Sequence, residues 1–144
     1  MTVIACKDGL MAADSGVWHG EVWMPCKTKL RRLPDGSIVG AAGWKPVFEE
    51  WISWYEAGAD PGKQPPAPKD DNDLDVIILN PDRTIWNMGF GKLWRNEWPI
   101  AAAGSHSEFV LGALLAGMSA PDAVALAIAH LSRARGPMTS MGVE

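Results

Sequence analysis

The 144-residue sequence has few cysteines, no large excess of charge and no long hydrophobic run. We expect its two cysteines, Cys6 and Cys26, to be reduced thiols of a cytosolic protein. A net charge of −4 gives no electrostatic reason to bind nucleic acid or an anionic membrane surface. No apolar run approaches the roughly 18 residues of a membrane span, and the N-terminus lacks the plan of a signal peptide. We therefore expect a cytoplasmic protein with neither nucleic acid nor membrane as a partner.

Metal-ligand patterns are also missing. The three histidines, His19, His106 and His130, have no metal-ligand spacing with cysteines or carboxylates. We therefore expect no metal and no other cofactor, and we expect His106 to be an exposed loop residue. Cys6 lies inside an apolar strand pattern, which makes it a poor candidate for a nucleophile.

The composition is that of an ordinary globular domain, with 47% apolar and 21% charged residues. This length fits one domain over residues 1–144, with a substantial core. Eight tryptophans are unusual for the length. Several of them are expected to pack in the core or in a subunit contact, namely Trp44, Trp51, Trp54, Trp94 and Trp98.

The first 42 residues have the pattern of two consecutive β-hairpins. Lys7-Asp-Gly9 and Pro34-Asp-Gly36 are the turn sequences, and a loop with Gly16 and Gly20 separates the hairpins. The flanking strands are expected at residues 2–6, 10–14, 27–33 and 37–42.

After Pro46 the apolar spacing becomes helical, and this helix should stop at Gly58. Residues 59–73 are rich in Pro, Lys and Asp, which predicts a surface loop. The order of strands, helix, strands and helix pair is that of a mixed α+β layered sandwich. The remaining elements are strands at 74–79, 84–88 and 100–103, helices at 108–116 and 121 to about 133, and a loop entering another strand at 136–144.

Thr2 stands directly behind the initiator methionine. If Met1 is removed, Thr2 carries a hydroxyl nucleophile and a free α-amine, which titrates at about pH 7.7–8.0 and can act as a base. A threonine paired with its own terminal amine is a recognised way to activate a weak hydroxyl. The alternative is a threonine that merely opens a strand.

The order and spacing of five sequence blocks, taken together, are informative. Asp14 lies 12 residues after Thr2, and Lys29 lies 15 residues after Asp14. The blocks are Thr2-Val-Ile-Ala, Leu10-Met-Ala-Ala-Asp-Ser15, Lys29-Leu-Arg-Arg-Leu33, Ile38-Val-Gly-Ala-Ala-Gly43 and Ala103-Gly-Ser-His-Ser107. Together they resemble the proteasome β-subunit and HslV-type branch of the N-terminal nucleophile hydrolases, most of all its short phage and bacterial members.

The resemblance implies an αββα layered sandwich, in which two antiparallel sheets are flanked by helices. Relatives often carry an Asp/Ser element near the C-terminus, whereas here no aspartate precedes Ser140. The strands that normally close the second sheet are expected to be missing or reduced to Val143-Glu144. The chain is then a minimal member, or is truncated at the C-terminus, or has an edge covered by an oligomer partner.

The resemblance also implies a set of catalytic residues. Thr2 Oγ would attack an acyl carbonyl, with its α-amine moving the proton through a water. Lys29 would stabilise the alkoxide, and Asp14 would orient Lys29. The N–H of Gly40 would donate to the oxyanion, and Ser105 would bind the terminal amine or the bridging water.

Each of these residues also has a plain structural reading. Asp14 could be a strand-end acid, and Lys29 could be a solvated strand lysine. Lys27, two residues earlier on the same face, is a competing candidate for the catalytic lysine. Gly40 could be a packing glycine under the helix, and Ser105 could be a helix N-cap.

The function implied by the resemblance is that of a threonine endopeptidase. It would cleave peptides or unfolded proteins inside a homo-oligomeric ring, with an ATP-dependent unfoldase as a further partner. Two alternatives stay open: an N-terminal nucleophile hydrolase acting on another amide, and an inactive member that serves in assembly or binding.

Overall fold

The first of the two sheets that form the sandwich is antiparallel and is built around the N-terminal hairpin. The computed structural model describes residues 2–19, 21–26, 29–67, 74–89 and 91–144. The strand order of this sheet is β10-β1-β2-β11. Its strands are β1 (Ile4–Lys7), β2 (Leu10–Ala13), β10 (Ile100–Ala103) and β11 (Thr139–Gly142). The predicted first hairpin is thus confirmed.

Five strands of the described residues form the second sheet, and they lie side by side in sequence order. A turn with Gly36 connects β5 to β6 and a turn with Asn80 connects β7 to β8, as their composition predicts, whereas the chain passes through α1 between β6 and β7. The strands are β5 (Leu30–Arg32), β6 (Ile38–Gly43), β7 (Leu74–Leu79), β8 (Ile85–Gly89) and β9 (Lys92–Asn96).

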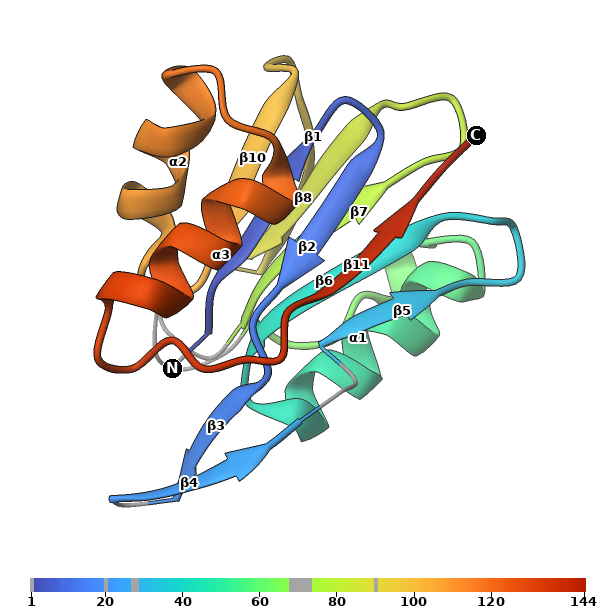
Figure 1. The fold of residues 1–144 in the computed structure, drawn as a ribbon. Helices are drawn as coiled ribbons and strands as arrows, with labels where there is room; N and C mark the ends of the chain where they lie inside the picture. Colours follow the sequence, from blue (N-terminus) through green and yellow to red (C-terminus); the bar gives the residue numbers. More distant parts are fainter. Residues whose placement is uncertain (1, 20, 27–28, 68–73, 90) are drawn as a thin grey trace.

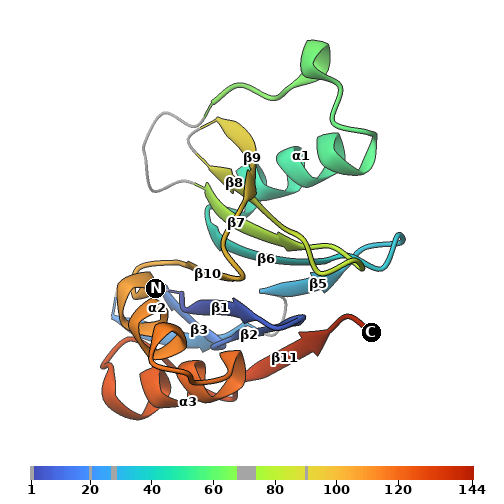
Figure 2. The same ribbon diagram turned by 90° about the horizontal axis from the view of Figure 1, so that it is seen from above.

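Helices cover the outer face of each sheet. Helix α1 (Lys45–Glu56) lies on the second sheet, while α2 (Ser107–Leu115) and α3 (Ala120–His130) lie on the first. Seen edge-on, the molecule has four layers in the order helices, sheet, sheet, helix (Figure 2). The expected α+β sandwich of two antiparallel sheets is therefore confirmed.

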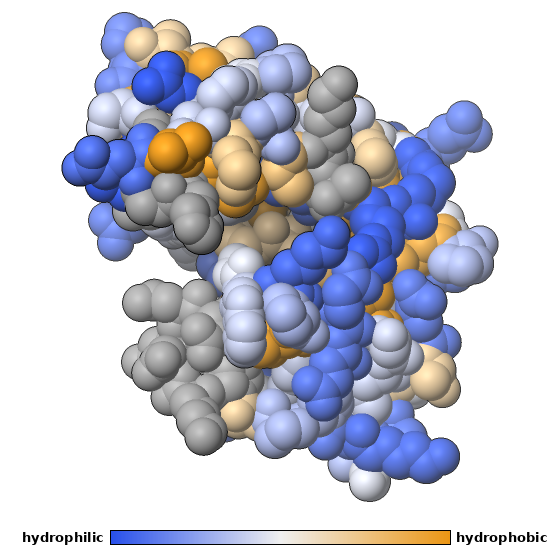
Figure 3. Space-filling model, turned by 90° about the horizontal axis from the view of Figure 1, so that it is seen from below, coloured by the Kyte–Doolittle hydropathy of each residue, from blue (hydrophilic) through white to orange (hydrophobic). Residues whose placement is uncertain are grey.

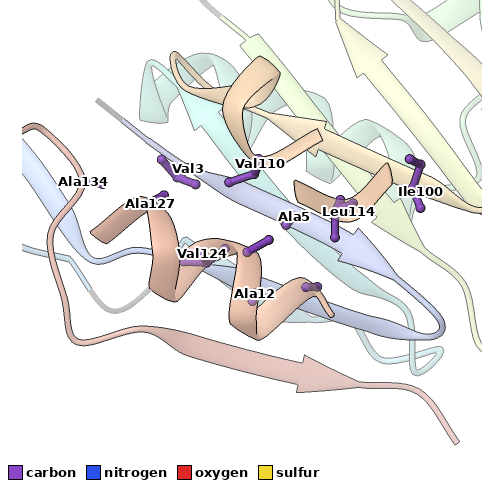
Figure 4. Close-up of a cluster of buried hydrophobic side chains, with 11 residues drawn as sticks. Val3, Ala5, Ala12, Ile100, Val110, Leu114, Val124, Ala127 and Ala134 are labelled. Carbon is purple, nitrogen blue, oxygen red and sulfur yellow. The ribbon is translucent and has the colours of Figure 1, made fainter. Parts of the chain in front are cut away.

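Small side chains let α2 and α3 lie close to the first sheet (Figure 4). Ser119 caps α3 by accepting a hydrogen bond from the Asp122 N–H (3.2 Å), as the capping sequence predicts. The buried cluster beneath these helices includes Val3, Ala5 and Ala12 from the sheet, and Val110, Leu114, Val124 and Ala127 from the helices.

The space between the two sheets is filled by larger apolar side chains. Side chains alternate along a strand, so Ile4 and Cys6 face this layer while Val3 and Ala5 face the helices. Met11, Ile77 and Leu79 also lie here. Burying a side chain of this size stabilises the fold by about 1.5–3 kcal/mol.

The tryptophans divide into two groups. Trp51 and Trp54 of α1 are buried against the second sheet and pack edge to face, with ring centroids 5.4 Å apart. Trp44, Trp94 and Trp98 are exposed, so the core role expected of them is wrong and the subunit contact stays a prediction.

The structure adds a hairpin where a loop is expected. β3 (Gly16–His19) and β4 (Val22–Pro25) pair with each other and project away from the sandwich (Figure 1). On the face from which this hairpin projects, a hydrophilic band separates the hydrophobic patches (Figure 3). The described surface there does not form one continuous apolar area.

Several predictions touch residues outside the described ranges. The expected strand at 27–33 begins there, and only Leu30–Arg32 of it is assigned as β5. The end of the expected loop at 59–73 also lies outside, while a short 3-10 turn occupies Pro61–Lys63. None of the described helices has the length and apolar character needed to span a membrane.

Candidate active site

A buried ion pair joins Asp14 and Lys29 beside the start of β1. Lys29 Nζ lies 2.8 Å from Asp14 Oδ1, and both side chains are almost completely buried. Lys29 also donates to the Gly16 carbonyl at 2.5 Å. The 15-residue spacing thus brings the predicted acid and lysine together. The reading of Lys29 as a solvated lysine is wrong, while Asp14 does directly follow a strand, β2, but is buried.

Asp14 also holds the backbone next to Thr2. Its Oδ1 accepts a hydrogen bond from the Val3 N–H at 3.0 Å, and its own N–H donates to the Val3 carbonyl at 3.1 Å. The Gly16 and Arg135 N–H groups both donate to Oδ2, each at 3.2 Å. With Lys29, these donors give the carboxylate four hydrogen bonds, which offset the cost of burying it.

The C-terminal segment reaches this cluster through its backbone. Besides the bond from Arg135 N–H to Asp14, the Arg135 carbonyl accepts from the Ser15 N–H at 2.7 Å. The Ser15 hydroxyl donates to the Pro137 carbonyl. Ser15 is buried by these contacts. Relatives often carry an aspartate in this segment, whereas here the backbone of residues 135–137 contacts the cluster directly.

Thr2 lies against the turn that follows β10, which we call the Gly104 turn (residues 104–106). A Cβ atom placed on Gly104 would lie 2.0 Å from the Thr2 carbonyl oxygen, and Gly104 has φ of +96°. Both observations require glycine at this position. Thr2 is half-buried, and Met1 lies outside the described residues.

Ser105 is exposed in the same turn, next to Gly104. The N-cap of α2 is His106, so the reading of Ser105 as a helix N-cap is wrong. His106 is half-buried, and its Nε2 is buried without a hydrogen-bond partner among the described residues. The expectation of an exposed histidine is therefore also wrong.

Gly40 is buried in the middle of β6. A Cβ atom there would lie 2.6 Å from Met11 Sδ and 3.0 Å from Ile4 Cγ2, so glycine is needed for the sheets to approach. The neighbouring Ala41 N–H donates to the carbonyl of Lys29, the residue before β5. Because N–H groups alternate in direction along a strand, that of Gly40 points to β7, where its register partner is Ile77.

This placement does not fit the predicted oxyanion role of Gly40, because its N–H is committed to the interior of the sheet. Gly40 is a packing glycine, but it packs under the first sheet rather than under a helix. Gly43, three residues later, ends β6, where it is exposed with φ of +125°. Its register partner is Leu74, the residue before Asp75.

Asp75 is a site residue that the sequence reasoning missed. Its Oδ2 accepts a hydrogen bond from the Gly104 N–H at 3.1 Å. Burial raises the pKa of its carboxyl, and the hydrogen bond from Gly104 acts in the opposite direction. A carboxylate inside the apolar run 74–79 was the sequence signal that could have found it.

Other groups are poor candidates for the chemistry. Burial raises the pKa of the Cys6 thiol to about 12, so the nucleophilic thiolate does not form near neutral pH. Within the described ranges, no group of three or more His, Cys, Asp or Glu side chains is arranged to hold a metal ion.

Solved structures of known proteins match this chain over its full length. Eukaryotic HslV from Trypanosoma brucei matches with a TM-score of 0.76 and 18% identity, covering 100% of this chain and 99% of its own. Thiobacillus denitrificans BPH in complex with epoxomicin matches with a TM-score of 0.67 and 20% identity, covering 99% and 98%. Another structure of the same BPH gives 0.66 and 21%, with the same coverage.

No protein-family model and no curated protein matches the sequence. The matched structures are covered almost completely, and Thr139–Gly142 forms a strand of the first sheet, so the expected loss of C-terminal strands is not supported. Identities of 18–21% establish the fold alone. The chain has the proteasome-β and HslV-type N-terminal nucleophile hydrolase fold.

Proposed function

We propose that this protein is a threonine peptidase whose nucleophile is Thr2, exposed by removal of Met1. The observation that carries the proposal is the buried Asp14–Lys29 pair, which is hydrogen-bonded to the backbone next to Thr2. Burying an ion pair has a large desolvation cost and is weak evidence for stability. A catalytic role explains why a charged pair lies beside Thr2.

The proposed reaction begins with attack of Thr2 Oγ on an acyl carbonyl. The α-amine of Thr2, acting through a water, takes the hydroxyl proton and later returns it to the leaving amine. The Lys29 ammonium stabilises the developing alkoxide and disfavours protonation of the nearby amine. Asp14 fixes the position of Lys29 and of the Val3 N–H. Ser105, in the Gly104 turn, is proposed to bind the α-amine or the water.

We assign the oxyanion contact to the N–H of Gly43 in place of Gly40. Gly43 is exposed at the end of β6, where a substrate can reach the backbone. Its strand partner precedes Asp75, which is bonded to the turn that contacts Thr2. One well-placed donor of this kind contributes about 2.7–4 kcal/mol to transition-state stabilisation.

The proposed substrates are peptides or unfolded proteins of the cytoplasm. A homo-oligomeric ring with an ATP-dependent unfoldase belongs to the same proposal, because a nonspecific nucleophile must be kept from folded proteins. The fold similarity to HslV and BPH supports this assembly. Light scattering of the purified protein gives the oligomer size, and a monomer under all conditions would contradict the ring.

Hydrolysis of fluorogenic peptides tests the activity. We expect turnover by the wild-type protein, its loss in Thr2→Ala, and partial retention in Thr2→Ser, which keeps a hydroxyl and an amine. Thr84→Ala, changed in a distant turn, is the matched control and should retain full activity. Equal turnover by Thr2→Ala and wild type would contradict the proposal. Cleavage of amide substrates without peptide cleavage would favour the amidohydrolase alternative.

A further inference from the structure

Asp75 points from the second sheet into the layer between the sheets. Along β7, Leu74, Val76 and Ile78 pack against the cluster beneath α1, whereas Ile77 and Leu79 face the first sheet. Alternation places Asp75 on the same side as Ile77 and Leu79. The inward-facing side chains of β7 are therefore Asp75, Ile77 and Leu79, and the carboxylate of Asp75 lies at the end of the sandwich where Thr2 lies.

The hydrogen bond of Asp75 crosses from one sheet to the other. Its acceptor oxygen belongs to β7, and its donor, the Gly104 N–H, follows β10 of the first sheet. Gly104 in turn packs so tightly on Thr2 that a Cβ atom would overlap the Thr2 carbonyl. Asp75, Gly104 and Thr2 thus form one continuous chain of contacts.

This arrangement has a cost that packing does not explain. Asp75 is half-buried, and removing a carboxylate even partly from water is unfavourable unless hydrogen bonds or charges compensate it; this burial raises the pKa of its carboxyl. An apolar residue at this position would instead extend the layer formed by Ile77 and Leu79. The carboxylate is accounted for if its contact with the Gly104 turn is needed at the site.

We propose that Asp75 is a positioning residue. It holds the Gly104 turn against Thr2 and thereby fixes the position of Thr2 Oγ relative to Lys29 Nζ. The inference rests on the proposed role of Thr2 as nucleophile. Without the Asp75 acceptor, the turn withdraws from the Thr2 peptide, and Oγ and the α-amine lose their alignment. Correct alignment of a nucleophile and its base is a large part of the catalytic advantage of such sites.

Amide hydrogen exchange at Gly104 tests the contact without any assay of activity. In Asp75→Ala the Gly104 N–H should exchange about tenfold faster or more, the size expected for losing a hydrogen bond to a charged acceptor. Asp75→Asn keeps a carbonyl acceptor and should retain most of the protection. Asp82→Ala removes a similar backbone contact at Thr84 and should leave Gly104 unchanged. Unchanged exchange in Asp75→Ala would overturn the proposal.

The effect on Thr2 is measured by inactivation with epoxomicin, separated into reversible binding and the rate of adduct formation. Asp75→Ala should lower the rate of adduct formation about tenfold with little change in binding, and Asp75→Asn should restore most of it. If Asp75 has only a structural role, Asp75→Ala lowers thermal stability without a selective fall in the rate of adduct formation. That result would overturn the proposal.

Failure of the proposed function has a different signature. If the wild-type protein forms no adduct at all, Thr2 is not a working nucleophile. The exchange data then decide whether Asp75 holds the turn: faster exchange in Asp75→Ala with protection in Asp75→Asn supports that contact, and exchange in Asp75→Ala equal to that of the wild type overturns it.

Discussion

Two ion pairs, whose basic residues are only two positions apart, differ sharply in their surroundings. Lys29 pairs with Asp14, and the side chains are 5% and 0% exposed. Arg31 pairs with Glu49 of α1, and the side chains are 35% and 41% exposed. Arg31 also lies over the ring of Phe48, 5.1 Å from its centroid.

The difference shows what each pair contributes. An exposed pair contributes at most about 1 kcal/mol, because water screens the charges and two long side chains are immobilised. A buried pair has a desolvation cost that its attraction barely offsets, yet removing one partner leaves an uncompensated charge. The Arg31–Glu49 pair attaches a helix to a sheet, whereas the Asp14–Lys29 pair organises the backbone around Thr2.

The largest effect is expected when the buried pair is broken. Lys29→Met leaves the Asp14 carboxylate buried without its cation, which should lower the free energy of unfolding by about 3–5 kcal/mol. The change also removes the ammonium from the site, so peptide hydrolysis should be lost. Urea denaturation and peptide turnover measure the two effects.

The double variant Asp14→Asn/Lys29→Met separates stability from catalysis. It removes both charges, so it should regain part of the lost stability while remaining inactive. The recovery is incomplete because an amide accepts hydrogen bonds with one oxygen, where the carboxylate accepts backbone N–H groups with both. A double variant that recovers peptide turnover along with its stability would contradict a catalytic role for this pair.

Glycine substitutions on β6 are expected to have intermediate effects. Gly40→Ala places a methyl group against Met11 and Ile4, and overpacking of this kind costs about 1–3 kcal/mol of stability. The folded fraction should retain its activity. Gly43→Ala places a methyl group at a backbone conformation with φ of +125°, at the edge of the site, and should lower turnover more than stability.

Thermal unfolding and turnover per folded molecule distinguish the two glycines. Loss of activity from folded Gly40→Ala, with Gly43→Ala unaffected, would reverse our assignment of the oxyanion donor.

The smallest effect is expected at the exposed pair. Arg31 holds the pKa of Glu49 below its usual range, chiefly through their hydrogen bond. A carboxyl whose pKa is lowered on folding stabilises the protein above its unfolded pKa of about 4.3, and this contribution is lost as the pH falls through the folded value.

Glu49→Gln should therefore lower stability at pH 7 by less than about 1 kcal/mol, without changing turnover. The difference from wild type should shrink at acidic pH and in 1 M salt, where exposed charges are screened over about 3 Å. Urea denaturation at two pH values and two salt concentrations checks this, and a difference that grows at acidic pH would contradict it.

The sequence predicts elements best where local chemistry determines them. Turn sequences such as Asp8-Gly9 located the hairpins, since Asp8 and Gly9 adopt the positive φ values that such turns require. The spacing of Asp14 and Lys29 was informative because two hairpins return both side chains to the start of β1. By contrast, Val22, Trp23 and Met24 of the projecting hairpin are all exposed, so they carry no alternating pattern.

The register of strand pairing and the contacts between distant residues could not be predicted from the sequence. The sequence alone does not distinguish Gly40 from Gly43 as oxyanion donors. Only the strand pairing shows that the N–H of Gly40 points into the sheet. Asp75 contacts Gly104 across 29 residues, which no local pattern predicts. Strand β9 was missed because Lys92–Asn96 is largely exposed at the edge of the sheet.

The most direct test of the central claim is the intact mass of the purified protein before and after incubation with epoxomicin, in wild type and in Thr2→Ala. The account predicts loss of Met1 and one adduct, which peptide mapping places on Thr2 and which Thr2→Ala does not form. Retention of Met1 with no adduct would contradict it, because the α-amine base would never be exposed, and the inactive assembly protein would then be the better interpretation.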